Sequence, residues 1–249
     1  MKAFQFLVIV FLPFAVAGCT TIPSYPSRAV NSGMTPSFAN TPDADRVSLF
    51  STDTDVLSDQ EIARILAYEY EPPEELRVGI LAIDESRWRA WSSELETTTA
   101  QVQSDFVRKL KRSGSIKEAS YLPGLLVPSE RTVGHFREAA ARYQADMLVI
   151  YQPSCRTYAK YRIFSPNTSR SYCTVEAVLL DARTGIVPLA VTESREFTAE
   201  TTESEISFQE TLRRAELGAV GDALTDIAAA VTGFLEEANS GAPRSGLDK

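Results

Sequence analysis

The sequence contains little histidine and cysteine: His135 is the single histidine in 249 residues, and there are three cysteines. No cluster of cysteine, histidine or carboxylate residues has the spacing of metal ligands, so we expect neither a metal site nor another cofactor. Isolated glycines at 79, 114 and 124 do not form a glycine-rich phosphate loop. His135 lacks an accompanying nucleophile motif, which favours a structural or surface role over general-base catalysis. The sequence therefore predicts a protein that is not an enzyme.

The chain also lacks an excess of basic residues. It has 25 lysines and arginines against 33 aspartates and glutamates, which gives a formal net charge of −8. General nucleic-acid binding requires basic surface that displaces counterions, and adhesion to anionic lipid requires similar charge. We therefore expect no nucleic-acid partner, and we expect membrane attachment through something other than overall charge.

The N-terminal segment has the layout of an export signal. Lys2 precedes an uncharged, largely apolar run over residues 3–17, which is short for a membrane span of about 20 residues. Val16-Ala17-Gly18-Cys19 then resembles the lipobox of bacterial lipoproteins. The resemblance implies a signal peptide over 1–18, cleaved before Cys19, and acylation of Cys19 by palmitate-type chains. The alternatives are an ordinary cleaved signal with an incidental cysteine, or an uncleaved anchor.

The residue after the lipobox bears on location. In enterobacterial lipoproteins an aspartate at that position favours retention in the inner membrane, whereas this chain has Thr20. The resemblance therefore implies the periplasmic face of the outer membrane. Residues 19–57, rich in proline, serine and threonine, are expected to form a flexible tether that reaches roughly 35 Å as a coil. An α/β domain over 58–238 follows, and a disordered tail over 239–249 ends the chain.

Hydrophobic periodicity predicts an α/β (α+β) domain with a mixed sheet of about five strands. The predicted strands are 76–83, one within 115–128, 146–163, 171–182 and 186–198. The predicted helices are a short one at 59–70, then 86–112, 130–144 and 203–237. After the short helix the order is β-α-β-α-β-β-β-α, with the helices mainly on one face. Trp88 and Trp91, three positions apart on a helix, are expected to lie in the core.

Cys155 and Cys173 remain once Cys19 is assigned to the lipid. An even pair in an oxidising compartment predicts a disulfide, and the alternative is two buried free thiols. A simple hairpin centred near Asn167 would leave these two cysteines a few residues out of register. The bond therefore requires a bulge, or a turn centred earlier in the chain.

Alternation along the predicted strands separates two faces of this hairpin, with Cys155 on one of them. The opposite face is rich in cations and tyrosines: Arg156, Tyr158, Lys160, Arg162, Arg170 and Tyr172. Arginine and tyrosine are favoured at interfaces, so one hypothesis is that this face binds an acidic partner. The alternative is a solvated strand that is kept charged to prevent edge aggregation.

Three local patterns carry a resemblance to a known fold. They are the strand over 77–81 before a long helix, the helix end that passes through Ala145-Asp146 into a strand, and the strand that ends in the turn Asp181-Ala182-Arg183-Thr184-Gly185. Over residues 76–236 this order resembles the domain shared by the curli secretion lipoprotein, the lipoprotein activators of penicillin-binding proteins and the N-terminal domain of TolB. The resemblance implies a domain that binds an envelope protein or assembles with itself.

Three functional hypotheses follow from the sequence. The first is a binding or adaptor protein for an envelope complex of cell-wall synthesis, secretion or transport. The second is a self-assembling structural subunit of such a complex, and the third, with least support, is an envelope hydrolase. The cations on the hairpin cannot comfortably face lipid tails, so a pore formed by this chain alone is not expected.

Overall fold

The computed structural model describes residues 57–68, 70–73, 75–83, 91–163, 165–205 and 207–240. The chain divides into two units, Met1–Arg46 and Val47–Lys249, and every described residue belongs to the second. The predicted signal, Cys19 and nearly all of the predicted tether lie outside the described residues, as does most of the tail.

The described chain contains one mixed sheet of five strands in the order β2-β1-β3-β4-β5. Its centre is parallel: β1 (Leu76–Ala82) pairs with β2 (Ile116–Tyr121) on one side and with β3 (Met147–Lys160) on the other. β4 (Thr168–Asp181) and β5 (Leu189–Glu200) then continue the sheet as antiparallel neighbours. The predicted mixed α+β fold is therefore confirmed.

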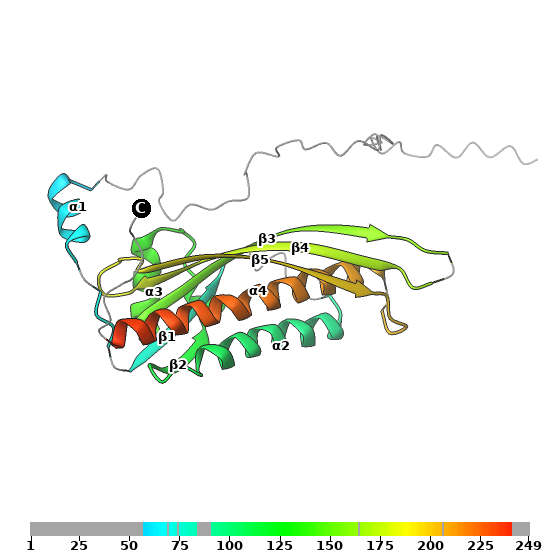
Figure 1. The fold of residues 1–249 in the computed structure, drawn as a ribbon, viewed down its shortest axis with the longest axis horizontal. Helices are drawn as coiled ribbons and strands as arrows, with labels where there is room; N and C mark the ends of the chain where they lie inside the picture. The colour runs from blue at the N-terminus through cyan, green and yellow to red at the C-terminus, as the bar shows by residue number, and fades with distance from the viewer. Residues whose placement is uncertain are drawn as a thin grey trace, which may run out of the picture. The chain divides into compact units, whose positions relative to one another are not determined.

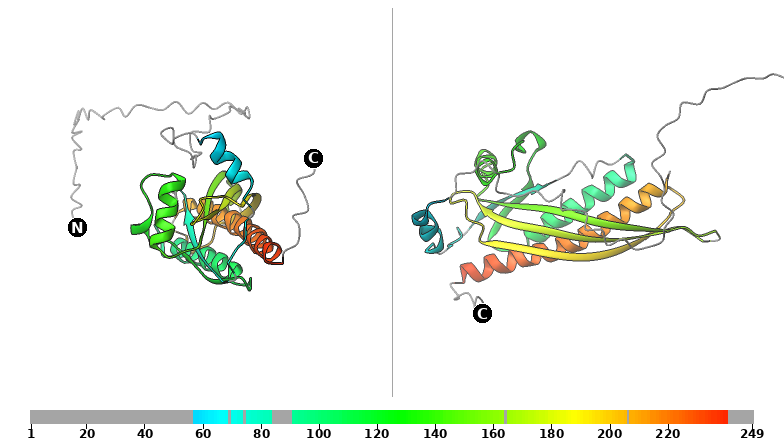
Figure 2. Two further views of the ribbon diagram at one scale, coloured as in Figure 1. Left: turned by 90° about the vertical axis from the view of Figure 1, so that its left-hand side faces the viewer. Right: turned by 90° about the horizontal axis from the view of Figure 1, so that it is seen from above.

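Helices cover both faces of the sheet, unequally (Figure 1). Two long helices, α2 (Ser93–Leu110) and α4 (Phe208–Asn239), lie side by side on one face, whereas α3 (Val133–Arg142) lies on the other. Figure 2 shows the same layers from two further sides. The short helices α1 (Asp59–Leu66) and η2 (Gly124–Leu126) bury no side chain.

α4 supplies the centre of the larger core. Its apolar positions recur at helical spacing, and a whole row of them is buried against the sheet and α2: Val220, Leu224, Ile227, Val231 and Leu235. Within the described residues, α4 alone has the length and hydropathy of a candidate membrane span. Because these side chains are buried in the domain, the apolar composition of α4 reflects its place in the core.

Two aspartates from the local sequence patterns form hydrogen bonds at strand ends: Asp146 just before β3, and Asp181 at the end of β4. Asp146 accepts a hydrogen bond from the backbone N of Arg77 at 3.0 Å and another from Nη2 of Arg183 at 3.0 Å. Asp181 accepts from the backbone N of Thr184 at 2.9 Å, and Gly185 follows with a φ of 78°, which suits glycine. These contacts join the start of β1 to the β4–β5 turn.

The predicted elements are all present, with shifted boundaries. The predicted helix at 86–112 begins at Ser93, where the side chain of Ser92 caps the first turn. Trp88 lies outside the described residues, and the expectation that Trp91 is a core residue is wrong. Trp91 is 52% exposed, and the Arg213 guanidinium stacks over its ring at 5.8 Å from the ring centre.

Close packing between β5 and α4 generates a test of this fold. A Cβ atom built on Gly218 of α4 would lie 2.5 Å from the ring of Phe197 on β5. We expect Gly218→Ala to lower the free energy of unfolding by about 1–3 kcal/mol, measured by urea denaturation. Gly233→Ala is the matched control on the same helix, because nothing lies within 4 Å of its added Cβ. The control should stabilise by about 0.5–1 kcal/mol, and equal effects of the two variants would contradict the packing.

Candidate functional site

The six hairpin residues singled out in the sequence line one open hollow of about 790 Å³ on the outer face of β3, β4 and β5. Cross-strand pairing brings Arg156 opposite Tyr172 and Tyr158 opposite Arg170. Thr198 and Glu200 of β5 complete this surface, together with Ala159 and Thr168. We name the six predicted residues the hairpin face: Arg156, Tyr158, Lys160, Arg162, Arg170 and Tyr172. Their role in binding stays a prediction.

In two cross-strand pairs of the hairpin face, an arginine on one strand lies opposite a tyrosine on the other. The Tyr158 and Tyr172 rings meet edge to face, with centres 6.0 Å apart and planes at 80°. Nη1 of Arg170 donates a hydrogen bond to the Tyr172 hydroxyl at 3.4 Å. This contact with Tyr172, and after it the nearby charge of Glu196, raises the pKa of Arg170 above its usual value.

Two acidic residues of β5 border this surface. Glu196 is the cross-strand partner of Tyr172, and Glu200 is the cross-strand partner of Thr168. By contrast, the sequence from residue 154 to residue 175 contains four cations and no aspartate or glutamate. The surface thus has a basic β3–β4 side and an acidic β5 border.

The disulfide between Cys155 and Cys173 is present, and the two residues are direct cross-strand partners. Their Cα atoms lie 4.1 Å apart, as in a close antiparallel pair. The β3–β4 register is continuous over fourteen pairs, so the turn is centred near residue 164. The second of the two ways to form the bond, a turn earlier than Asn167, is therefore the one that occurs.

The disulfide marks a boundary on the inner face of the hairpin. Toward the middle of the sheet, β4 continues with buried Val175, Ala177 and Leu179 in the apolar core. Toward the turn, the corresponding positions are Thr157 and the fully buried Ser169 and Ser171. The Thr157 hydroxyl donates to Oε1 of Glu216 on α4 at 2.8 Å and lies 3.1 Å from the Ser171 hydroxyl. Polar contacts thus replace apolar packing behind the hairpin face.

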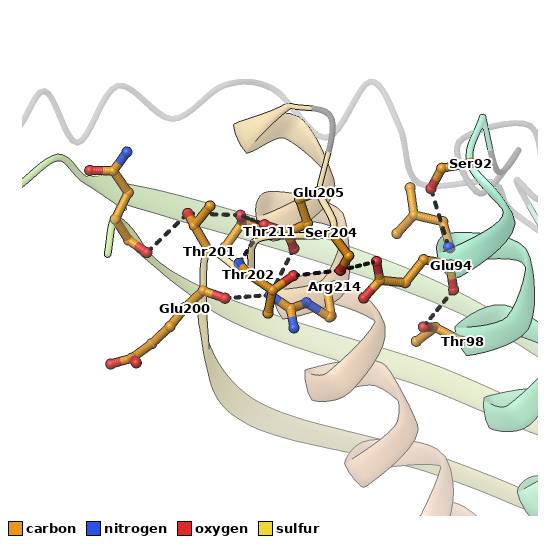
Figure 3. A network of polar contacts seen from close by, with 12 residues as sticks. Ser92, Glu94, Thr98, Glu200, Thr201, Thr202, Ser204, Glu205, Thr211 and Arg214 are labelled. Atoms are coloured by element: carbon orange, nitrogen blue, oxygen red, sulfur yellow. Dashed lines mark hydrogen bonds and ion pairs between the residues drawn. The ribbon is translucent and has the colours of Figure 1, made fainter. Parts of the chain in front are cut away.

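A second polar network holds the same end of the domain (Figure 3). The nearly buried carboxylate of Glu205 pairs with Nη2 of Arg214 at 2.7 Å and accepts from the Thr211 hydroxyl at 2.5 Å. Thr201 lies 3.1 Å from the Thr211 hydroxyl and donates its backbone N to the Asn167 carbonyl at 2.9 Å. This chain of contacts connects the β3–β4 turn to the start of α4.

Sequence reasoning missed this network and the contribution of β5. The stretch 200–205 is rich in threonine and glutamate, which is equally typical of any solvated loop before a helix. The tertiary structure shows that Thr201 of this loop donates to Asn167 of the hairpin turn and that Glu205 pairs with Arg214 of α4. Similarly, Thr198 and Glu200 reach the hollow through a strand register that composition does not specify.

His135 lies in a helix cap. Its Nδ1 is 2.7 Å from the hydroxyl of Thr132, which also caps its backbone N, and Nε2 is 3.8 Å from Glu130. These contacts organise the first turn of α3. Across the described part of the chain, no three His, Cys, Asp or Glu residues gather as a metal site would require.

Comparison with protein families and with curated proteins finds no match to this chain. Loosely similar solved structures exist. A hypothetical protein from Chlamydia trachomatis aligns at 12% identity with a TM-score of 0.35, over 65% of this chain and 98% of that chain. The PelC dodecamer from Paraburkholderia phytofirmans aligns at 12% identity and 0.33, over 64% and 94%. A minor lipoprotein from Acinetobacter baumannii aligns at 9% and 0.30, over 67% and 93%.

Bacterial lipoproteins are thus among the similar structures, and a lipoprotein from Neisseria meningitidis is another, at 13% identity and a TM-score of 0.29 over 64% of this chain and 99% of that chain. At such low TM-scores these likenesses carry no argument about function. The more specific resemblance to the curli, penicillin-binding-protein-activator and TolB domains stays a prediction.

The disulfide generates a stability prediction. It closes a loop of 18 residues in sequence, and chain entropy assigns such a crosslink about 3 kcal/mol. We expect reducing agent to lower the free energy of unfolding by about that amount, measured by denaturant titration. The double variant Cys155→Ser/Cys173→Ser is the control, since reductant should leave its unfolding unchanged. A wild-type protein indifferent to reduction would contradict the assigned role of the bond.

Proposed function

We propose that this chain is a lipid-anchored, non-enzymatic binding protein of the bacterial envelope that engages an acidic segment of another envelope protein. The proposed location is the periplasmic face of the outer membrane, reached through acylated Cys19. The hairpin face is the proposed contact surface. The partner complex belongs to cell-wall synthesis, secretion or transport, and the chain acts as its adaptor.

One observation carries this proposal: four cations and two tyrosines converge on one open surface in a chain of net charge −8. Tyrosine and arginine are enriched among the residues that contribute most to binding at protein interfaces. Tyr158 is 60% exposed and Tyr172 is 44% exposed, so both rings remain available to a partner. An acidic segment would complement the β3–β4 side and be repelled by Glu196 and Glu200, which fixes its position.

The support behind the hairpin face strengthens the proposal. The disulfide joins β3 to β4, and the Thr157 hydroxyl of β3 donates to Glu216 of α4, so the hairpin is held from its inner face. A surface held in one conformation loses less entropy when a partner binds. The backbone that carries these cations is therefore held in place, which lowers the entropy lost when an acidic segment binds.

Self-assembly is the second candidate, and α1 favours it. This helix is capped by reciprocal hydrogen bonds between Ser58 and Glu61, yet it exposes its apolar residues Ile62, Ile65 and Leu66. A helix of eight residues is marginal in water unless its apolar face packs on something. Its first turn is acidic, so the hairpin face of a second copy would complement it.

In-cell photo-crosslinking tests the choice between these functions. A photoreactive residue replacing Tyr158 should give one dominant product with another envelope protein, identified by mass spectrometry. The same probe at Leu125, which is 99% exposed on η2, is the control and should give no such product. Arg170→Glu should lower the yield at Tyr158 by about tenfold, because it reverses a charge at the centre of the surface.

Each other outcome decides against the adaptor role. Crosslinks only between copies of this chain would establish the self-assembling subunit instead. Crosslinks of equal yield from Tyr158 and Leu125 would show that the hairpin face is not a specific surface.

The lipid anchor is tested independently. Intact mass spectrometry of the protein extracted from membranes should give a chain that begins at Cys19 and carries the added mass of two or three acyl chains. Cys19→Ala should abolish both the added mass and the cleavage before residue 19. An unmodified chain that begins elsewhere would overturn the lipoprotein assignment.

A further inference from the structure

We infer that the described residues 161–163 and 165–167, between β3 and β4, form a membrane-contacting tip, which places Tyr161 and Ile163 in the interface of a bilayer that contains anionic phospholipid. The tip is the end of the hairpin and meets lipid. It shares Lys160, Arg162 and Arg170 with the hairpin face, whereas its apolar residues Tyr161 and Ile163 lie outside that face. The inference goes beyond the proposed function and rests on it in one respect, because the lipid anchor keeps the domain near a membrane.

The tip exposes apolar side chains that the domain leaves uncovered. Ile163 is 90% exposed and Tyr161 is 73% exposed, and the turn lies beyond the N-termini of α2 and α4 (Figures 1 and 2). The Tyr161 ring rests against Phe208 at the start of α4, with ring centres 5.1 Å apart. Aromatic and aliphatic side chains at the end of a projecting element are well placed to enter a membrane interface.

Cations surround these apolar side chains. Lys160 and Arg162 alternate with Tyr161 and Ile163 along the chain, and Arg170 lies on the returning strand. Residues 154–175 contain four cations and no acidic residue, so the hairpin end is basic, and Glu200 of β5 is the acidic residue in the hollow beside it. The hairpin end therefore carries the cations that adhesion to anionic lipid requires, although the chain as a whole is acidic. Long basic side chains can place their charges at phosphate groups while their stems lie along apolar surface.

Two backbone groups of the tip, the N–H of Arg162 and the carbonyl of Asn167, are hydrogen-bonded within the domain. The backbone N of Arg162 donates to Oδ1 of Asn167 at 2.8 Å, which closes the turn on itself. The Asn167 carbonyl accepts from the backbone N of Thr201 at 2.9 Å and from its hydroxyl at 3.2 Å. A lipid environment offers few partners for backbone groups, so internal pairing lowers the cost of entering it.

Lipid fits this tip better than protein does. A stable protein interface buries roughly 800 Å² on each partner, whereas the described residues of the tip offer two exposed large apolar side chains, Tyr161 and Ile163. Membrane contact requires no matching concave surface and gains from each inserted side chain and each cation separately. The chemistry of the tip, apolar at its end and basic on its flanks, matches the apolar and anionic layers of a bilayer.

Vesicle binding by the mature chain without lipid, residues 20–249, tests the tip separately from the anchor. In co-sedimentation at about 0.01 M salt, where charges are weakly screened, the wild type should bind phosphatidylcholine vesicles that contain about 30% phosphatidylglycerol. It should bind vesicles of phosphatidylcholine alone much more weakly. Ile163→Asp should lower the affinity for the anionic vesicles by about tenfold or more. Arg162→Glu should lower it by about twentyfold.

Matched controls separate these effects from general changes in charge or folding. Leu125→Asp introduces the same charge at another exposed apolar position, and Lys111→Glu reverses an exposed charge at the end of α2. Both should retain affinity within about twofold. Because Ile163 is so exposed, Ile163→Asp should unfold at the wild-type denaturant concentration.

Failure of this inference is distinguishable from failure of the proposed function. Equal sedimentation with and without phosphatidylglycerol, no sedimentation at all, or wild-type binding by Ile163→Asp would overturn the tip assignment and leave the Tyr158 crosslink unaffected. In the lipidated protein in cells, a photoreactive residue at position 163 should crosslink to phospholipid. A dominant protein product at this position would assign the tip to a protein interface and overturn the inference.

Discussion

The continuous register between β3 and β4 is the constraint on which the other features of the hairpin depend. Fourteen consecutive residue pairs place Cys155 opposite Cys173, and the same alternation sends Arg156, Tyr158 and Arg170 to the opposite face. A shift of one residue would exchange the two faces, moving cations against α4 and exposing the disulfide. The core, the basic surface and the turn therefore form together or not at all.

The two halves of this hairpin are stabilised differently. Near the middle of the sheet, the row of apolar side chains on α4 buries the inner face, and the hydrophobic effect dominates. Beyond the disulfide, the Thr157 hydroxyl connects β3 to α4, and the Glu205–Arg214 ion pair connects the loop after β5 to α4. Polar contacts require specific geometry and penalise any partner left unpaired, so they favour one position of the hairpin end. This arrangement gives a projecting element a defined shape without a large core beneath it.

Much of the fold could be predicted because local physics governed it. The helical spacing of apolar residues in α4 predicted a helix, and the short β-branched run of β1 predicted a strand. Asp181 and Gly185 indicated the β4–β5 turn. Predictions failed or stayed open where distant segments decide the outcome. Trp91 was expected in the core from its helical spacing, but its helix begins after it, and it stacks with Arg213 at the surface. The pairing of Glu205 likewise depends on a helix that follows it.

By itself, the sequence determined the mixed α+β class, the order of the strands and helices, and the concentration of cations and tyrosines between residues 154 and 175. These three features can be read from hydrophobic periodicity and composition, which are properties of short windows of the sequence. Only the tertiary structure decided that the turn is centred near residue 164, which permits the disulfide, and that β5 adds Glu196 and Glu200 to the border of the basic surface. Strand register depends on the summed packing of both strands against α4, and no local window of sequence contains that sum.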